Sequence, residues 1–224
     1  SLGHAGFIAI GSYSGAILGK MINGLPGLFA GMAVGVVISV IVAFLVGLPT
    51  LRLKGDYLAI ATLGVAEIIR VAVTNMKITN GAAGISGVPL TNTWTITYIA
   101  LVLTTILILN YTFSSAGRAT YAVLQDEIAA ESMGVQVTKY KILAFVLGAA
   151  TASIGGTLSA TTLGAVTPSD FTFMKSIEVL IIVVFGGIGS FTGSFVAAIL
   201  LGIINLVLQP FGQLRMIIYA VALI

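Results

Sequence analysis

Two charged residues, Glu67 and Arg70, interrupt an otherwise apolar stretch of the sequence. Their spacing of three places them on one face of a helix, where their side chains can pair. Ionisable side chains at membrane depth are costly and normally face a protein interior or a water-filled cavity. Two interpretations follow: the pair lines a solute path, or it is a structural ion pair near the outer interface, with Arg70 extending toward the headgroups. The second interpretation is the favoured one.

A glycine-rich block containing Gly186, Gly187 and Gly189 ends an apolar run that begins at Ile177. Half-length helices that end at mid-depth allow transporters to present backbone polar groups to a substrate. Small residues also allow helices to pack closely, and both roles can hold together. The glycine spacing is not that of a nucleotide-binding loop, and no Lys-Ser or Lys-Thr pair follows, so phosphate binding is not predicted.

The longest polar stretch, residues 117–134, predicts a short amphipathic helix between two apolar segments. Tyr121, Leu124 and Ile128 recur at helical spacing and form one apolar stripe. The acidic residues on another side are Asp126, Glu127 and Glu131. Gly134 suits the position just past a helix end. Helices that lie on membranes usually have a basic polar face, so this acidic face favours docking of the apolar stripe into a partner's groove.

The composition excludes a soluble domain. The 224 residues are 58% hydrophobic and 8% charged, against about 45–50% and about 25% in soluble domains. The ten basic residues are widely spaced, so no patch for nucleic acid is predicted despite the net charge of +3. With no cysteine and the single histidine His4, neither a metal site nor a catalytic constellation is expected.

Long uncharged runs predict an all-α, polytopic integral membrane protein with about 7–8 membrane segments, because about 20 apolar residues cross a bilayer as a helix. The predicted segments are 4–19, 27–49, 56–75, 96–113, 142–163, 177–189, 194–210 and 213–224. One of these, 177–189, is broken by glycines. Residues 1–224 are predicted to form a single membrane-embedded domain, and the chain is expected to be a fragment of a longer one.

Basic residues in short loops predict the orientation. One set of alternate loops carries Arg52, Lys54, Arg118, Lys139 and Lys141, and the other set carries Lys20, Lys77 and Lys175. The larger number favours a cytoplasmic location for the first set. The loop 114–141 is therefore predicted to be cytoplasmic, and the glycine-rich loop 76–95 to be outside.

The blocks 117–119, 126–130 and 133–135 resemble, in order and spacing, the coupling-loop signature of permease subunits in branched-chain amino acid ABC importers. The LivM-like branch of that family is the most similar. Segment 51–64 together with 67–70 is similar to the most diagnostic block of the family. Further similar blocks are 1–7, 79–85 and 184–190.

The resemblance implies a permease that moves leucine, isoleucine and valine into the cell, driven by ATP hydrolysis on separate subunits. It implies that this chain is not itself an enzyme and binds no cofactor, since ATP-Mg would bind two cytoplasmic ATPase subunits. The other implied partners are a second homologous permease subunit, an extracytoplasmic solute-binding protein and the lipid bilayer of a bacterial or archaeal plasma membrane. The same importer family carrying urea or another small amide or amino acid stays open as an alternative.

The resemblance also assigns residues to roles. The ATPase-coupling helix, within loop 114–141, would contain Arg118, Asp126, Glu127, Ala129, Ala130 and Gly134. Independently of the resemblance, the charge and glycine patterns described above make Glu67, Arg70, Gly186, Gly187 and Gly189 the candidate residues of a substrate path. In that interpretation the two charged residues would contact the ammonium and carboxylate of an amino acid. The residues Asp170, Lys175 and Glu178 form either a solvated loop cluster, the default interpretation, or a docking point for the solute-binding protein. Asp170 follows Pro168-Ser169, so a place at a helix start is a further alternative for it.

Three further expectations concern helix packing and two alternative functions. The small residues Ser153, Gly155, Gly156, Thr157 and Ser159 are interpreted as a packing face. An ion-coupled secondary transporter would need acidic residues in mid-helix, and Glu67 is the only plausible one. A membrane anchor without transport function would need neither the glycine break nor the acidic docking helix.

Overall fold

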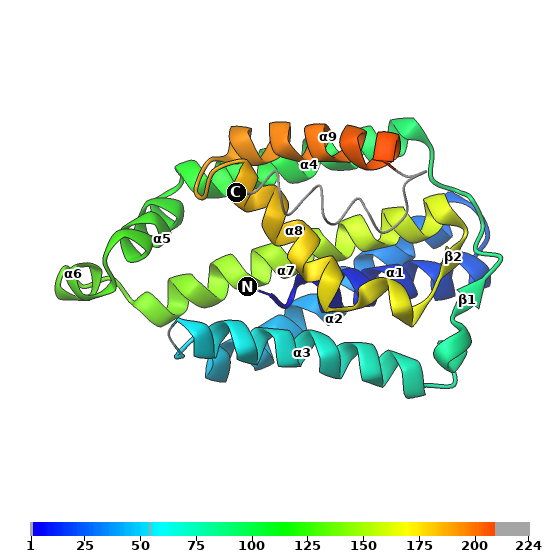
Figure 1. Ribbon diagram of the computed structural model, residues 1–224, viewed down its shortest axis with the longest axis horizontal. Coiled ribbons are helices and arrows are strands. Elements are labelled where there is room, and N and C mark those ends of the chain that lie inside the picture. The colour runs from blue at the N-terminus through cyan, green and yellow to red at the C-terminus, as the bar shows by residue number, and fades with distance from the viewer. Residues whose placement is uncertain (1, 54, 209–224) are drawn as a thin grey trace. The chain divides into compact units, whose positions relative to one another are not determined.

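The computed structural model describes residues 2–53 and 55–208 (Figure 1). The chain forms two compact units, and the boundary between them follows Phe173. The helices of the first unit are α1 (His4–Met21), α2 (Leu25–Thr50), α3 (Asp56–Asn75), α4 (Trp94–Phe113), α5 (Ser115–Gln125), α6 (Glu127–Ser132) and α7 (Val137–Leu163). The second unit contains α8 (Phe173–Phe185) and α9 (Phe191–Leu208).

Short elements lie in the connections of the first unit. They are the strands β1 (Ile85–Ser86) and β2 (Ala165–Val166) and the 3-10 turns η1 (Gly81–Ala83) and η2 (Pro168–Phe171). The two strands pair antiparallel, with Ile85 opposite Val166. The loop after α3 is thereby joined to the loop after α7.

The predicted all-α, polytopic class is confirmed. Within the described ranges, four helices are long and apolar enough to cross a membrane, namely α2, α3, α4 and α7. The predicted span 56–75 coincides with α3, and the predictions for α1, α2 and α4 differ from the structure by two residues or fewer at each end. The span count of 7–8 is supported only roughly, because α1, α8 and α9 are not among those four.

Four predicted segments need correction or lie partly or wholly outside the described residues. Helix α7 begins at Val137, five residues before the predicted 142, because a helix continues past the hydrocarbon while its lysines reach water. The segment predicted as 177–189 is the helix α8, which starts and ends four residues earlier. The end of segment 194–210 and all of segment 213–224 lie outside the described residues.

Helices α1, α2 and α7 pack together through glycines (Figure 1). A Cβ atom on Gly11 would lie 1.9 Å from the Ser153 carbonyl oxygen, and a Cβ atom on Gly31 would lie 2.7 Å from the Cα of Gly15. These positions therefore admit no side chain without moving a helix. Small residues at such contacts provide the close backbone approach on which helix association in lipid depends.

Hydroxyl groups add hydrogen bonds to this close approach. The Ser12 hydroxyl donates to the Gly156 carbonyl at 2.9 Å, and the Thr157 hydroxyl donates to the Gly11 carbonyl at 2.9 Å. All four residues are buried. The predicted packing role is confirmed for Ser153, Gly156 and Thr157.

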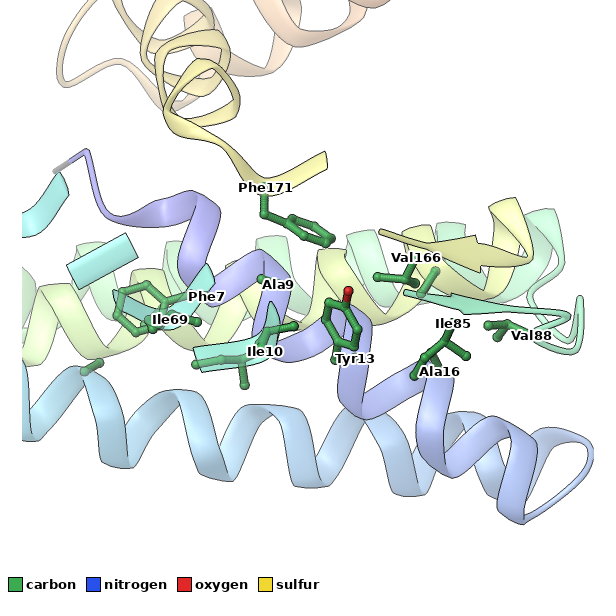
Figure 2. Close-up of a cluster of buried hydrophobic side chains, with 14 residues drawn as sticks. Phe7, Ala9, Ile10, Tyr13, Ala16, Ile69, Ile85, Val88, Val166 and Phe171 are labelled. Carbon is green, nitrogen blue, oxygen red and sulfur yellow. The ribbon is translucent and has the colours of Figure 1, made fainter. Parts of the chain in front are cut away.

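A buried apolar cluster extends from Phe7, in the first turn of α1, to the two strands (Figure 2). Phe7 meets Phe145 edge to face, with ring centroids 5.5 Å apart, and Tyr13 meets Phe171 with centroids 6.2 Å apart. Ile85 and Val166 continue the cluster across the strand pair. The cluster fixes the strand pair and η2 against α1.

Candidate coupling helix and substrate path

The predicted single amphipathic helix over 117–134 is wrong, because the chain breaks at Asp126. Asp126 has an extended backbone (φ −155°) between α5 and α6. Its carboxylate accepts hydrogen bonds from the N–H groups of Ile128 (2.8 Å) and Ala129 (3.1 Å), which makes it the N-cap of α6. A capping residue has a non-helical backbone, so α5 cannot continue through it.

The end of α6 matches the prediction made for Gly134. Its φ is +83°, and its N–H donates to the Glu131 carbonyl at 2.9 Å. The N–H of Val135 donates to the Ala130 carbonyl at 3.0 Å. These two bonds form a Schellman motif, which glycine favours because the C′ residue is left-handed.

The exposed apolar side chains lie on two helices rather than on one stripe. Tyr121 and Leu124 are about 60% exposed on α5, while Ile128 on α6 is 73% exposed and Met133 just after it is 84% exposed. The break at Asp126 therefore contradicts the prediction that Ile128 continues the stripe of α5. Together these side chains still present an apolar surface next to carboxylates.

The six residues assigned to the coupling helix have different environments. Asp126 and Ala129 are exposed, whereas Ala130 is buried with 5% exposure. Arg118 is exposed, and its guanidinium donates to the Phe113 carbonyl at 3.0 Å, at the end of α4. Only part of the predicted set is therefore accessible to a docking partner.

Glu127 forms an ion pair with Lys141 on α7. The side chain of Glu127 is 35% exposed and that of Lys141 is 21% exposed. Lys141 is a candidate functional residue that the sequence analysis used only to predict orientation. The two residues lie on different helices, 14 positions apart across a turn, so no helical period predicts their pairing.

Glu67 and Arg70 form the predicted pair on α3. The Nε of Arg70 donates to both carboxylate oxygens at 3.0 Å, and one Nη also bonds a carboxylate oxygen. The two side chains are 44% and 28% exposed, respectively. Glu67 precedes the end of α3 at Asn75 by eight residues, which is about 12 Å along the helix axis. The pair therefore lies nearer the end that leads into loop 76–95.

In the second unit the glycines end α8 as predicted. Helix α8 has 13 residues, which is about 20 Å and shorter than the hydrocarbon layer of about 30 Å. Gly187 (φ +90°) and Gly189 (φ +88°) form the turn into α9. The Gly193 N–H donates to the Ser190 hydroxyl at 3.1 Å. The break is thus a turn between two helices, and it belongs to a different unit from Glu67 and Arg70.

The α8–α9 hairpin is closed by glycines on both sides of the turn. A Cβ atom on Gly186 would lie 2.5 Å from the Cα of Ser194, and one on Gly193 would lie 1.8 Å from the Gly186 carbonyl oxygen. A hollow of about 400 Å³ beside the turn is lined by both glycines, Ser190 and Thr192 among others. Backbone polar groups and hydroxyls can therefore contact a small solute here.

A second hollow, of about 460 Å³, lies between α4 and α7. Gly155 and Ser159 line it and are exposed, so the packing role predicted for these two residues is wrong. They lie on a different face of α7 from the residues that contact α1. At one end, the Asn92 amide donates to the hydroxyls of Thr97 (2.9 Å) and Thr162 (2.8 Å), which ties the start of α4 to α7.

The three residues of the predicted outer cluster are divided between the units. The Asp170 carboxylate accepts from the Thr167 N–H at 3.0 Å and from its hydroxyl at 2.8 Å, as the capping box of η2. Lys175 pairs with Glu178 at 2.9 Å on α8. Asp170 therefore has a structural role at the start of η2.

Comparison with known proteins decides the family. The family described as the permease component of branched-chain amino acid transport systems matches residues 1–224. The chain belongs to this family. It is similar to the high-affinity branched-chain amino acid transport system permease protein LivM of Salmonella typhimurium and of Escherichia coli K12. Each is 35% identical over 251 residues, covering 96% of this chain and 59% of the relative.

The high-affinity branched-chain amino acid transport system permease protein LivH of Escherichia coli K12 is 34% identical over 110 residues. That match covers 49% of this chain and 34% of LivH. No solved structure matches the chain. This member of the permease family spans about 59% of the length of its LivM relatives. With its apolar helices, family membership makes it a multi-pass membrane protein.

Proposed function

We propose that this chain is a transmembrane permease subunit of an ABC importer that moves leucine, isoleucine and valine into the cell. The observation that carries the proposal is the 35% identity to LivM over 96% of the chain. Both LivM and LivH are named as permease proteins of a high-affinity branched-chain amino acid transport system. The importer is placed in the plasma membrane of a bacterium or archaeon.

The proposed assembly contains this chain, a second homologous permease, two cytoplasmic ATPase subunits that bind ATP-Mg, and an extracytoplasmic solute-binding protein. Similarity to LivH as well as to LivM supports the second permease, because two permease proteins bear the same system name. This chain itself binds no cofactor and hydrolyses nothing in the proposal. In the proposed assembly this chain provides a path for the solute and changes conformation when the ATPase subunits close.

The coupling device in this proposal is the α5–α6 segment in a cytoplasmic loop. The exposed Tyr121, Leu124, Ile128 and Met133 provide an apolar surface for the groove of an ATPase subunit. The acidic residues beside them favour a protein groove over an anionic membrane surface. The cap at Asp126 and the Schellman turn at Gly134 hold the two ends of α6 in place.

The substrate path in this proposal uses the glycine turn more than the charged pair. The turn between α8 and α9 exposes backbone groups beside a hollow of about 400 Å³. Glu67 and Arg70 satisfy one another, and they lie in the half of α3 that leads into loop 76–95, which fits a structural pair. Selectivity for an apolar side chain can be set by the solute-binding protein, so path residues affect rate more than apparent affinity.

Uptake of labelled solutes tests the proposal. Cells that carry the full-length protein with its partner subunits are compared with cells from which the operon is deleted, using leucine, isoleucine, valine and urea. We expect uptake of the three amino acids to be lost on deletion and restored by the operon, and to depend on ATP. Restoration of urea uptake alone would replace the proposed solute, and uptake abolished by a proton uncoupler at constant ATP would favour a secondary transporter.

A further inference from the structure

Helix α7 connects the proposed coupling loop to the strand pair within one element. It runs without interruption for 27 residues, which is about 40 Å. It begins three residues after Gly134 and is followed directly by β2, which pairs with β1. Along its length it packs against α1 and α2 (Figure 1).

The packing of α7 on its neighbours leaves little room for sliding. A Cβ atom on Gly156 would lie 2.1 Å from the Ile8 carbonyl oxygen, and one on Gly11 would lie 1.9 Å from the Ser153 carbonyl oxygen. Backbones this close resist a shift of one helix along the other, because packed interfaces hold discrete arrangements. Helices α1 and α7 therefore move together.

The strand pair is fastened to the same body. Ile85 and Val166 pair across the strands and are both buried in the cluster around α1. The ammonium group of Lys20, at the end of α1, donates to the Ser86 carbonyl at 2.9 Å. A displacement of α7 is thus carried to the loop between α3 and α4.

The angle between α6 and α7 depends on the short connection between them. Residues 133–136 link the two helices, and a Cβ atom on Gly134 would meet nothing within 4 Å. The Cβ position of Gly134 therefore contributes no packing between α6 and α7. The ion pair between Glu127, in the first turn of α6, and Lys141, in the second turn of α7, spans this connection.

We infer that Lys141 is a positioning residue for energy coupling: through Glu127 it fixes the angle of α6 against α7, so that movement imposed on α6 displaces α7 and the strand pair as one body. The inference rests on the proposed importer function. Without the ion pair, part of the ATPase movement is absorbed by bending at residues 133–136. Fewer solute molecules then cross per ATP hydrolysed, while the ATPase subunits still bind the exposed apolar surface.

The test uses the full-length importer, with both permeases and both ATPases, reconstituted in proteoliposomes with the solute-binding protein. The variants are Glu127→Gln, Lys141→Gln and the charge exchange Glu127→Lys with Lys141→Glu. Lys139→Gln is the matched control, because Lys139 is exposed two residues away and loses the same charge. Leucine uptake and ATP hydrolysis are measured on the same vesicles, and retention of the ATPase subunits is measured on purification.

We expect each single variant to lower the ratio of leucine transported to ATP hydrolysed by about two- to fivefold, the range for a partly exposed ion pair. The charge exchange restores most of the ratio, and Lys139→Gln leaves it unchanged. ATPase subunits remain bound in every variant. If the charge exchange restores the ratio, the loss in the single variants comes from the broken ion pair and not from a general loss of folding.

Three results overturn the inference while leaving the proposed function standing. The first is a wild-type ratio in both single variants. The second is a charge exchange no better than the worse single variant. The third is loss of the ATPase subunits on purification of the single variants, which makes the pair part of docking rather than of transmission. A wild-type importer that hydrolyses ATP without moving leucine, isoleucine or valine refutes the proposed function itself.

Discussion

Replacing Gly134 with valine isolates the role of the turn that ends α6. A left-handed backbone costs a non-glycine residue about 1–2 kcal/mol, and a β-branched side chain is among the least tolerated there. Because a Cβ atom at Gly134 would meet nothing within 4 Å, crowding at the Cβ position adds no further cost. A shift of about 1–2 kcal/mol makes the intact turn about 5- to 30-fold less populated relative to its alternatives. If transport requires this turn, leucine uptake falls by up to that factor.

The assay for this prediction compares three substitutions of Gly134 in the reconstituted importer. Asparagine adopts the left-handed conformation more readily than other side chains, so Gly134→Asn retains most uptake, Gly134→Ala less, and Gly134→Val the least. Gly64→Ala is the control, because Gly64 is helical and a Cβ atom there also meets nothing within 4 Å. Equal uptake for the Asn and Val variants, at equal protein level, would refute the assignment of the effect to backbone conformation.

Further predictions address topology, the hairpin and the charged pair. Cysteines introduced at Ser132 and Ser86 of this cysteine-free chain should react with an impermeant maleimide in intact cells only at Ser86, and labelling of Ser132 would reverse the orientation. Gly186→Leu should lower both uptake and the thermal midpoint of unfolding, since even a Cβ atom there would lie 2.5 Å from the Cα of Ser194. Glu67→Gln with Arg70→Gln should retain at least about half of wild-type uptake, as partly exposed pairs contribute little, and complete loss would make the pair a substrate contact.

The long helices could be predicted from the sequence because apolar runs and lipid leave the chain few alternatives. Charged residues marked the ends of α1 and α3 well. At Lys139 and Lys141 the same criterion was wrong, since a lysine can remain within a helix and extend its ammonium group into water. Hydrophobicity therefore locates the part of a helix in the membrane and not its ends in water.

The details of the candidate site were harder to predict from the sequence. Asp126 fits an acidic helix face and an N-cap equally well in sequence, and only the structure shows that its carboxylate binds backbone N–H groups. Gly134 could be predicted, because few residues other than glycine suit a left-handed helix end. The pairing of Glu127 with Lys141 depends on the angle between two helices, which no local pattern encodes.

The contact between α1 and α7 has a consequence for how the protein is made. Ser12 and Gly156, joined by a hydrogen bond, are separated by 144 positions in the chain. At synthesis rates of about 5–20 residues per second, roughly 7–30 s pass between the synthesis of Ser12 and that of Gly156 on α7. Throughout that interval the Ser12 hydroxyl lacks its acceptor on α7 and can bond only to carbonyls of its own helix, and α1 has α2 but not α7 against it. The close packing of α1 on α7 therefore forms only after residue 156 has been synthesised.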